Sequence, residues 1–357
     1  MGALLEAVTW PCGPDRYLEL VNPLWSLREV RAKIVDVRRP AVGSVTLLLR
    51  PNRNWQGFRA GQHVALTVDV GGVWRTRCYS PACSGHRPNG LLELTVAVEP
   101  GGLVSRYLHA DAQPGTVVRL SQAQGHFTLP DRRPEHILLI SGGSGITPVM
   151  SMLRTLSDEG FCATERRGQV TFLHYARSAA HVAYRHELAA LAGAHPGLRL
   201  LRAYTRDRGG ELTGRFHPEH LPDLGSDAAA WVCGPAGLVA AVRTYWQRAA
   251  IRAPLRTEQF TAPPPAPSTT NGKPHGQVYF ARSDRRITNT GAPLLDQAEA
   301  AGLTPMFGCR MGICLTCTSR KTTGAVRHRY AGELCTEPDS DIQICAVMPV
   351  GDVTVDL

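Results

Sequence analysis

The cysteines near the C-terminus constrain this chain more than any other feature. Three of them are separated by four and then by two residues, as Cys309, Cys314 and Cys317. This C-x4-C-x2-C spacing is typical of a [2Fe–2S] site, which needs a fourth thiolate from farther along the chain. The small residue Gly312 lets the loop amides approach the sulfides closely. A zinc site is the alternative, but zinc sites usually carry two C-x2-C pairs.

Two further cysteines, Cys335 and Cys345, are the candidates for the fourth ligand. Cys345 begins the sequence Cys-Ala-Val-Met-Pro directly after an apolar run, and here the segment resembles the plant-type ferredoxins. The resemblance implies that Cys345 completes the ligand set with the three cysteines of the loop. It also implies that residues 276–357 form an α+β domain of the β-grasp type.

A proline-rich stretch at 262–275 precedes this domain, and its composition predicts a linker. Because 357 residues exceed what one hydrophobic core organises, further domains are expected before it. After the linker we expect a strand at 277–280, a helix near 293–301 and closing strands. Residues 1–28 form an extension that either covers the neighbouring domain or serves as a docking surface.

Two kinds of pattern fill the chain between the extension and the linker. Residues 29–130 contain short apolar or β-branched runs between Gly and Pro, which predicts an antiparallel β-barrel. Its expected strands are 29–37, 44–50, 62–69, 73–80, 91–98 and 116–121. Residues 131–261 alternate apolar runs with helical patterns, which predicts an α/β domain with a doubly wound parallel sheet. Its expected elements are 136–140, 147–158, 170–175, 181–193, 198–204, 228–233 and 236–250.

Two motifs in the expected barrel suit a flat ring and a pyrophosphate. Arg77 and Tyr79 share one face of a strand that ends at Ser80, because alternate strand residues point the same way. Arg77 suits a phosphate, and Tyr79 suits stacking on a ring. Residues 101–105, Gly-Gly-Leu-Val-Ser, open a short helix whose first amides and Ser105 hydroxyl suit a pyrophosphate. Alone, the first motif would be read as an exposed strand end.

Together these motifs resemble the ferredoxin–NADP reductase superfamily. The resemblance implies that Arg77, Tyr79 and Ser80 grip a flavin, with the tyrosine on the ring and the serine near its reactive N5. It further implies that Gly102, Val104 and Ser105 hold the diphosphate. Relatives that use FMN have a less helical second segment, so FAD is expected.

A glycine-rich loop follows the expected strand 136–140 and opens a helix. Its glycines permit close backbone approach, its proline fits a first helical turn, and a helix N-terminus attracts phosphate. The same superfamily has such a loop at its nicotinamide dinucleotide site, and a Cys-Gly-Pro triplet that lines the nicotinamide pocket. The matching residues are Gly142, Gly143, Gly145, Thr147 and Pro148, and Cys233, Gly234 and Pro235. Without these neighbours Cys233 would be read as a small buried hydrophobe.

The residues after the second strand of the parallel sheet bear on the choice of nicotinamide cofactor. NAD sites usually place an acid there for the ribose 2′-hydroxyl. This strand is instead followed by Arg177, Ser178 and Arg185, with no acid before Glu187. These side chains suit a 2′-phosphate, so NADPH is expected, with NADH as the alternative. Otherwise the two arginines are solvated surface residues.

Phe260 stands at the end of the α/β segment, just after Glu258 and Gln259. The reductase superfamily often has an aromatic or acidic group near the flavin at this point. Phe260 either shields the ring or ends the last strand as a core residue. The side chains expected to take part in catalysis are therefore Tyr79, Ser80, Cys233 and Phe260.

Charge and composition limit which classes of partner and which cellular compartment are expected. The formal net charge is +9, and the excess of basic residues lies before residue 276, so that part can attract phosphates, acidic partners or a membrane surface. The basic residues are dispersed and match no nucleic-acid-binding motif, so no nucleic acid is expected. No apolar run would span a bilayer and no secretory signal is evident. Ten cysteines in such a chain indicate a reducing compartment, so a cytoplasmic protein is expected.

These resemblances imply an electron-transfer chain. A nicotinamide delivers electrons in pairs, a [2Fe–2S] cluster takes them singly, and a flavin converts between them. A separate oxygenase or desaturase protein is the expected acceptor, with any membrane contact made through it, and the chain is expected to act as a monomer. Residues 22–26, Asn-Pro-Leu-Trp-Ser, and 50–53, Arg-Pro-Asn-Arg, resemble bacterial reductases that serve membrane acyl-CoA desaturases. This favours a membrane di-iron desaturase or hydroxylase. The alternatives are an NADH-dependent reductase for a Rieske dioxygenase or cytochrome P450, and a non-enzymatic iron–sulfur sensor.

Overall fold

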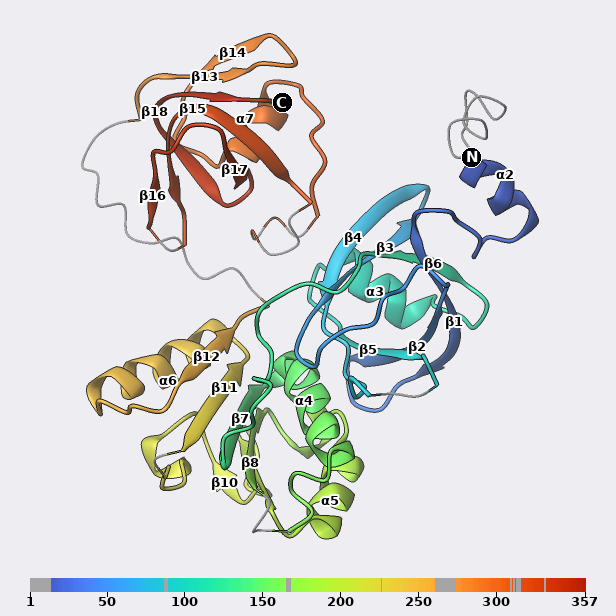
Figure 1. Ribbon diagram of the computed structural model, residues 1–357, viewed down its shortest axis with the longest axis vertical. Coiled ribbons are helices and arrows are strands. Elements are labelled where there is room, and N and C mark those ends of the chain that lie inside the picture. The colour runs from blue at the N-terminus through green and yellow to red at the C-terminus, as the bar shows by residue number, and fades with distance from the viewer. Residues whose placement is uncertain are drawn as a thin grey trace. The chain divides into compact units, whose positions relative to one another are not determined.

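The chain folds into two compact units in the computed structural model (Figure 1). The first unit ends at Phe260 and holds two sheets, and the second holds the C-terminal sheet. The structure describes residues 14–86, 89–164, 168–225, 227–260, 274–308, 310, 312, 316–330 and 332–357. The predicted linker lies outside these residues except for its last two positions.

Six antiparallel strands form the first sheet, in the order β4-β3-β6-β1-β2-β5. They are β1 (Val30–Arg38), β2 (Ser44–Pro51), β3 (Val64–Val70), β4 (Val73–Tyr79), β5 (Leu92–Ala97) and β6 (Val117–Leu120). Leucines and other apolar residues at alternating positions of these strands fill a common core, among them Leu47, Leu49 and Leu66. Helix α3 (Leu103–Ala110) packs Val104 and Leu108 into the same core. The predicted antiparallel barrel is confirmed.

The second sheet is parallel, in the order β10-β9-β8-β7-β11-β12. Its strands are β7 (His136–Gly142), β8 (Gln169–Ala176), β9 (Leu198–Tyr204), β10 (Leu212–Thr213), β11 (Ala228–Cys233) and β12 (Leu255–Glu258). Figure 1 shows α6 (Ala236–Arg248) on one face and α4 (Ile146–Asp158) and α5 (Arg185–Ala194) on the other. The chain runs from β7 outward to β10 and then returns to β11 on the other side of β7. The carboxyl edge of β7 is therefore the switch point where ligands bind in doubly wound sheets.

Two details of this sheet differ from the expectation. Strands β10 and β12 were not predicted; β12 is Leu-Arg-Thr-Glu, too short and too polar to stand out as a strand. Helix α5 begins at Arg185 instead of 181. A short 3₁₀ turn occupies Ala179–His181, and Tyr184 takes a left-handed conformation (φ 62°) that interrupts the helix before Arg185.

One buried arginine joins the barrel to the parallel-sheet domain. Arg154 of α4 contacts Glu93 of β5 at 2.7 Å and Glu187 of α5 at 2.6 Å. Burial alone would lower the pKa of Arg154, but its hydrogen bonds and opposite charges with Glu187 and Glu93 raise it. The cation therefore keeps its charge and ties three elements at fixed positions.

The C-terminal unit is a mixed sheet covered by one helix. Its strands run in the order β14-β13-β18-β15-β16, and β17 pairs with β15. They are β13 (Gln277–Phe280), β14 (Arg285–Thr288), β15 (Thr318–His328), β16 (Leu334–Cys335), β17 (Ser340–Gln343) and β18 (Val347–Val355). Helix α7 (Leu294–Ala300) packs Leu294, Leu295 and Ala298 on the sheet. The predicted α+β domain of the ferredoxin type is confirmed.

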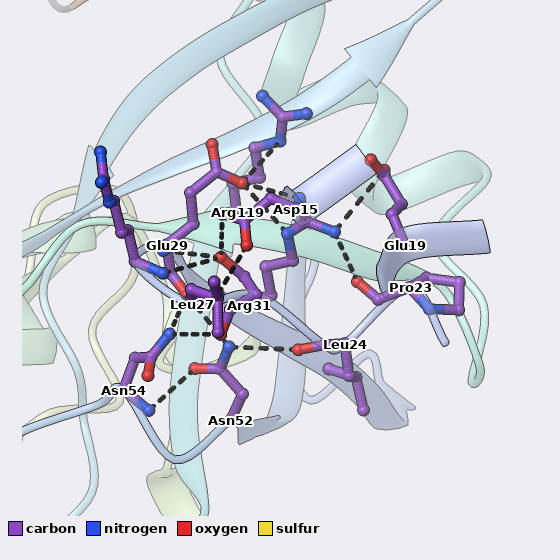
Figure 2. A network of polar contacts seen from close by, with 12 residues as sticks. Asp15, Glu19, Pro23, Leu24, Leu27, Glu29, Arg31, Asn52, Asn54 and Arg119 are labelled. Atoms are coloured by element: carbon purple, nitrogen blue, oxygen red, sulfur yellow. Dashed lines mark hydrogen bonds and ion pairs between the residues drawn. The ribbon is translucent and has the colours of Figure 1, made fainter. Parts of the chain in front are cut away.

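The described part of the N-terminal extension contains helix α2 (Pro14–Val21) and a connecting segment that lies on the barrel. A network of polar contacts holds this segment in place, and its labelled residues are drawn in Figure 2. Among the residues that the structure describes, no helix combines the length and apolar character needed to cross a bilayer.

Candidate functional site

Ser80 follows the last residue of β4 and is buried, with 1% of its surface exposed. Its hydroxyl has no hydrogen-bond partner among the described residues. Tyr79 packs partly against the barrel core, and Arg77 donates from Nη1 to the carbonyl of Thr76 at 2.7 Å. Because buried polar groups are nearly always paired, the orphan hydroxyl of Ser80 fits a site that a bound polar group completes.

The start of helix α3 forms a close-fitting cradle. A Cβ at Gly102 would lie 2.6 Å from Ser105 Oγ, so only glycine leaves this space open. The Ser105 hydroxyl accepts a hydrogen bond from the Glu99 amide at 3.1 Å, which leaves its own proton for an acceptor. The first turn contains no acidic residue. Small residues, exposed amides and a donating hydroxyl at a helix start fit a phosphate group.

The glycine-rich loop after β7 packs directly on the end of β11. A Cβ at Gly145 would lie 2.3 Å from the Cys233 carbonyl oxygen, and one at Gly234 would lie 3.0 Å from the Gly142 amide. Gly143 has a left-handed conformation (φ 54°), and Thr147 Oγ1 donates to the Ser144 carbonyl at 3.2 Å. The structure thus brings the predicted loop and the predicted Cys-Gly-Pro triplet together at the switch point of the sheet.

Glu258 is a buried acid beside this loop that the sequence interpretation left without a role. The register of β11 and β12 pairs it with Cys233, and its side chain is 15% exposed. Glu258 Oε2 has no hydrogen-bond partner among the described residues, and Oε1 lies 3.9 Å from His63 Nδ1. Burial raises the pKa of Glu258 to about 8, so the carboxyl holds its proton at neutral pH. Burial and the charge of Glu258 also raise the pKa of Cys233, which stays a neutral thiol.

The available signal for Glu258 was its position at the end of the last strand, next to Phe260. Phe260 itself is half-buried and packs against the core of the parallel-sheet domain. Its role as a ring shield stays a prediction.

A cluster of basic side chains forms where β8 and β9 end. The Arg206 amide donates to the Arg177 carbonyl at 2.9 Å, so both arginines stand at one sheet edge, and both side chains are exposed. Ser178 Oγ contacts His181 Nδ1 at 2.8 Å. Partial burial and then the charges of Arg177 and Arg206 lower the pKa of His181. Arg206 was not predicted, because only the pairing of β8 with β9 brings it beside Arg177.

Ser178 and Arg185 line a common cavity of about 620 Å³ between the barrel and the parallel-sheet domain. Arg38 and Thr46 of the barrel form another wall, and Asp207 lies at its side. The cavity therefore opens beside the basic cluster and can take a group the size of a nucleoside.

The predicted cluster ligands fall partly outside the described residues, because Cys309 and Cys314 are not among them. Cys317 and Cys345 are both buried in the core of the C-terminal unit. The Gly312 amide donates to Cys345 Sγ at 3.1 Å, and Gly312 is left-handed (φ 75°). Cys335 is half-buried in β16, with its Sγ 3.5 Å from Ser340 Oγ. An amide aimed at the sulfur of Cys345 is the arrangement that stabilises a negatively charged thiolate cluster.

Comparison with known proteins gives three domain matches in chain order. Residues 42–129 match the oxidoreductase FAD-binding domain, residues 139–244 the oxidoreductase NAD-binding domain, and residues 278–350 the 2Fe-2S iron-sulfur cluster binding domain. The orphan hydroxyl of Ser80, the cradle at Gly102 and the amide on Cys345 Sγ fit the groups that these domains bind.

Relatives match nearly the whole chain. An "NADPH oxidoreductase" of Mycobacterium tuberculosis is 40% identical over 98% of this chain and 90% of its own length. A component of the 1,2-phenylacetyl-CoA epoxidase of Escherichia coli is 28% identical over 91% of this chain and 96% of its own. The structure of phthalate dioxygenase reductase has the same fold, with a TM-score of 0.61, 21% identity, and coverage of 92% of this chain and 97% of that one.

Proposed function

This chain belongs to the family of FAD- and nicotinamide-binding oxidoreductases with a C-terminal [2Fe–2S] domain, and we propose that it transfers electrons from NADPH to a membrane di-iron desaturase or hydroxylase. FAD, NAD(P)H and the cluster are its cofactors, and it acts as the electron-transfer component of an oxygenase-type system. The choice of NADPH and the identity of the acceptor are the parts proposed here. The location proposed is the cytoplasm, where the cluster cysteines stay reduced.

The residues of the switch point prepare the site for electron exchange. FAD, when bound, accepts electrons in pairs from the nicotinamide and passes them on singly. Glu258 holds a buried proton there and keeps it below about pH 8, and the Ser80 hydroxyl at the end of β4 is a second buried group without a hydrogen-bond partner among the described residues. Cys233, which is paired with Glu258 across β11 and β12, stays uncharged, so a nicotinamide ring bound there would meet a neutral surface. Gly142, Gly143 and Gly145 let the backbone approach a dinucleotide.

The basic cluster at Arg177 and Arg206 is the single observation that carries the choice of NADPH. A 2′-phosphate carries charge that two guanidinium groups at one sheet edge can pair with hydrogen bonds. The relative named for NADPH supports the same choice. Asp207 is the nearby acid that would favour the ribose hydroxyl of NADH. The preference between NADPH and NADH therefore measures whether the arginines or Asp207 dominate the site.

We expect Arg177→Ala and Arg206→Ala each to raise the KM for NADPH about tenfold, since a hydrogen bond to a charged group is worth roughly 1.5–3 kcal/mol. The KM for NADH should stay unchanged, because NADH has no 2′-phosphate. Arg199→Ala, at the opposite end of β9, is the matched control and should leave the KM values for NADPH and NADH unchanged. A wild-type protein that strongly prefers NADH would overturn the assignment.

The acceptor is proposed from the resemblance at residues 22–26 and 50–53, and the epoxidase relative supports it because that enzyme is named for a CoA thioester. The experiment is reconstitution of the holoprotein with three acceptors under NADPH: a membrane acyl-CoA desaturase, a Rieske dioxygenase and a cytochrome P450. We expect turnover with the desaturase at the lowest concentration of reductase. Efficient turnover with either of the other two acceptors alone would replace the proposal by the alternative one.

A further inference from the structure

Large apolar side chains are unusually exposed on the N-terminal extension. Among the described residues, Leu20 and Val21 at the end of α2 are 74% and 73% exposed. Tyr17, Trp25 and Leu27 are also exposed, so five such residues fall within 17–27. We call these five exposed side chains together the N-terminal apolar face. Scattered single exposures are ordinary, but a concentration of this kind marks an interaction surface.

Polar contacts join α2 to the connecting segment and fasten that segment to the barrel. Asp15 accepts hydrogen bonds from the Ser26 hydroxyl at 2.9 Å and from the Leu27 amide at 2.7 Å. Arg31 of β1, whose side chain is 4% exposed, donates to the Pro23 carbonyl at 3.0 Å. Figure 2 shows Asp15, Arg31 and Pro23 within one network of polar contacts.

Two asparagines after β2 complete the attachment. Asn52 Nδ2 donates to the Leu24 carbonyl at 3.1 Å, and Asn54 Nδ2 donates to the Ser26 carbonyl at 3.0 Å (Figure 2). Because barrel side chains bind the carbonyls of Pro23, Leu24 and Ser26, the segment is fixed on the barrel and its apolar side chains stay on the outside. The exposure is thus built into the fold.

The charges around the N-terminal apolar face are asymmetric. The acids beside this face are paired with the buried Arg31, Glu19 at 3.6 Å and Glu29 at 2.9 Å. Exposed basic residues flank the attachment points: Lys33 and Arg50 are paired across β1 and β2, Arg28 directly follows the segment in sequence, and Arg53 stands between Asn52 and Asn54.

A second exposed tryptophan joins the same network. Trp74 of β4 stacks under Arg119, whose guanidinium carbon lies 4.2 Å from the ring centroid. Arg119 in turn lies 3.8 Å from Glu29, which connects this ring to the attachment of the extension. Exposed tryptophan, leucine and valine together with arginine are typical of segments that rest in a membrane interface.

We propose that the N-terminal apolar face, with its flanking Lys33, Arg50 and Arg53, binds the surface of an anionic phospholipid bilayer directly. Apolar side chains enter the interface while the cations meet the lipid phosphates. An acidic protein partner would need its acids matched to these same cations, but the exposed aliphatic tip at Leu20 and Val21 favours the hydrocarbon boundary. The proposal goes beyond the reductase function, because this contact needs no acceptor and no cofactor turnover.

The test is sedimentation of the full-length holoprotein with vesicles of phosphatidylcholine alone or with about 30% phosphatidylglycerol, an anionic lipid that attracts exposed cations. We expect binding to the anionic vesicles that weakens with salt, and little binding to the neutral ones. The double variant Leu20→Ser/Val21→Ser should weaken binding about tenfold or more, since each apolar side chain contributes roughly 1 kcal/mol or more when buried. Arg50→Gln/Arg53→Gln should weaken it by a similar factor, at about 1 kcal/mol per cation.

Matched controls keep the result interpretable. Val42→Ser removes an exposed apolar side chain elsewhere on the barrel, and Arg243→Gln/Arg248→Gln removes two exposed cations of α6; both should bind like wild type. NADPH–ferricyanide turnover should be equal in all variants. No binding to anionic vesicles, or equal binding by the apolar double variant, overturns the proposal. So does a double variant that keeps vesicle binding but loses electron delivery to a soluble acceptor, which would mark the face as a protein-docking site.

Discussion

Glu258 shows how one side chain acquires its chemistry from its surroundings. An exposed glutamate is ionised at neutral pH, whereas this one is paired in register with Cys233 and has only 15% of its side chain exposed. Charge is costly there, so the pKa rises to about 8 and the acid form persists. A protonated carboxyl can donate a hydrogen bond or a proton, which an ionised one cannot.

The raised pKa of Glu258 also makes stability depend on pH. The folded protein binds the extra proton between the ordinary value of 4.5 and about 8. The contribution to stability is therefore complete below about pH 4.5 and is lost as pH rises through 8. Glu258→Gln removes the ionisation, so its Tm should exceed that of wild type increasingly from about pH 5 to 9, by ~3 °C or more at the alkaline end. Differential scanning calorimetry checks this.

The control for that prediction is Glu219→Gln, because the Glu219 side chain is almost fully exposed. Its melting curve should follow wild type across the whole pH range. Parallel curves for Glu258→Gln and wild type would show that Glu258 ionises normally in the folded state.

At the scale of elements, the loop between β7 and α4 depends on close backbone packing. Its glycines lie against the end of β11 so tightly that the carbonyl of Cys233 occupies the place of a Cβ at Gly145. The two strand ends and the loop therefore form one unit at the switch point. Shape at this edge is set by backbone contacts, and side chains at the glycine positions would force the strands apart.

Gly145→Ala is expected to raise the KM for NADPH by about tenfold or more and to lower the Tm, because its Cβ cannot be accommodated without moving β11. Gly193→Ala in α5 is the matched control, since nothing lies within 4 Å of its Cβ position. The control should gain roughly 0.5–1 kcal/mol from its higher helix propensity and keep its kinetics. Steady-state kinetics and thermal melts on both variants test this prediction. Normal NADPH kinetics for Gly145→Ala would contradict the packing argument.

At the scale of the whole molecule, the redox sites are divided between two compact units with separate cores. Tyr79, Ser80, the start of α3 and the nicotinamide motifs belong to the first, and the buried Cys317 and Cys345 belong to the second. A change in the second core should therefore leave the chemistry of the first intact. Joining the units in one chain keeps their local concentration high, near ~mM for a short connection.

Cys345→Ser is expected to abolish the iron–sulfur absorption and NADPH-dependent reduction of cytochrome c, while NADPH–ferricyanide turnover stays within about twofold of wild type. Cys335→Ser should keep both activities and the full visible spectrum. The measurements are anaerobic absorption spectra and the rates of cytochrome c and ferricyanide reduction. The reverse pattern between the two variants would make Cys335 the fourth ligand.

Much of this protein can be predicted from local sequence. The C-x4-C-x2-C spacing, the glycine-rich loop and the alternating strands are each contained in a few consecutive residues, so their geometry follows from covalent connectivity. The three domain types were predicted from such patterns, and FAD, a nicotinamide cofactor and the cluster from the family resemblances that they carry; these predictions are confirmed. The short polar strand β12 was missed because its pairing with β11, and not its own residues, makes it a strand.

What only the tertiary structure decided is proximity between distant residues. The register of β11 with β12 places Glu258 at Cys233, and the pairing of β8 with β9 places Arg206 at Arg177. The sequence left open whether the extension covers the barrel or docks a partner; the structure shows its polar groups bound to the barrel and its apolar side chains exposed. The raised pKa of Glu258, the basic cluster and the exposed apolar face each depend on which parts of the chain pack together. That packing involves the whole unit and not only neighbours in the chain.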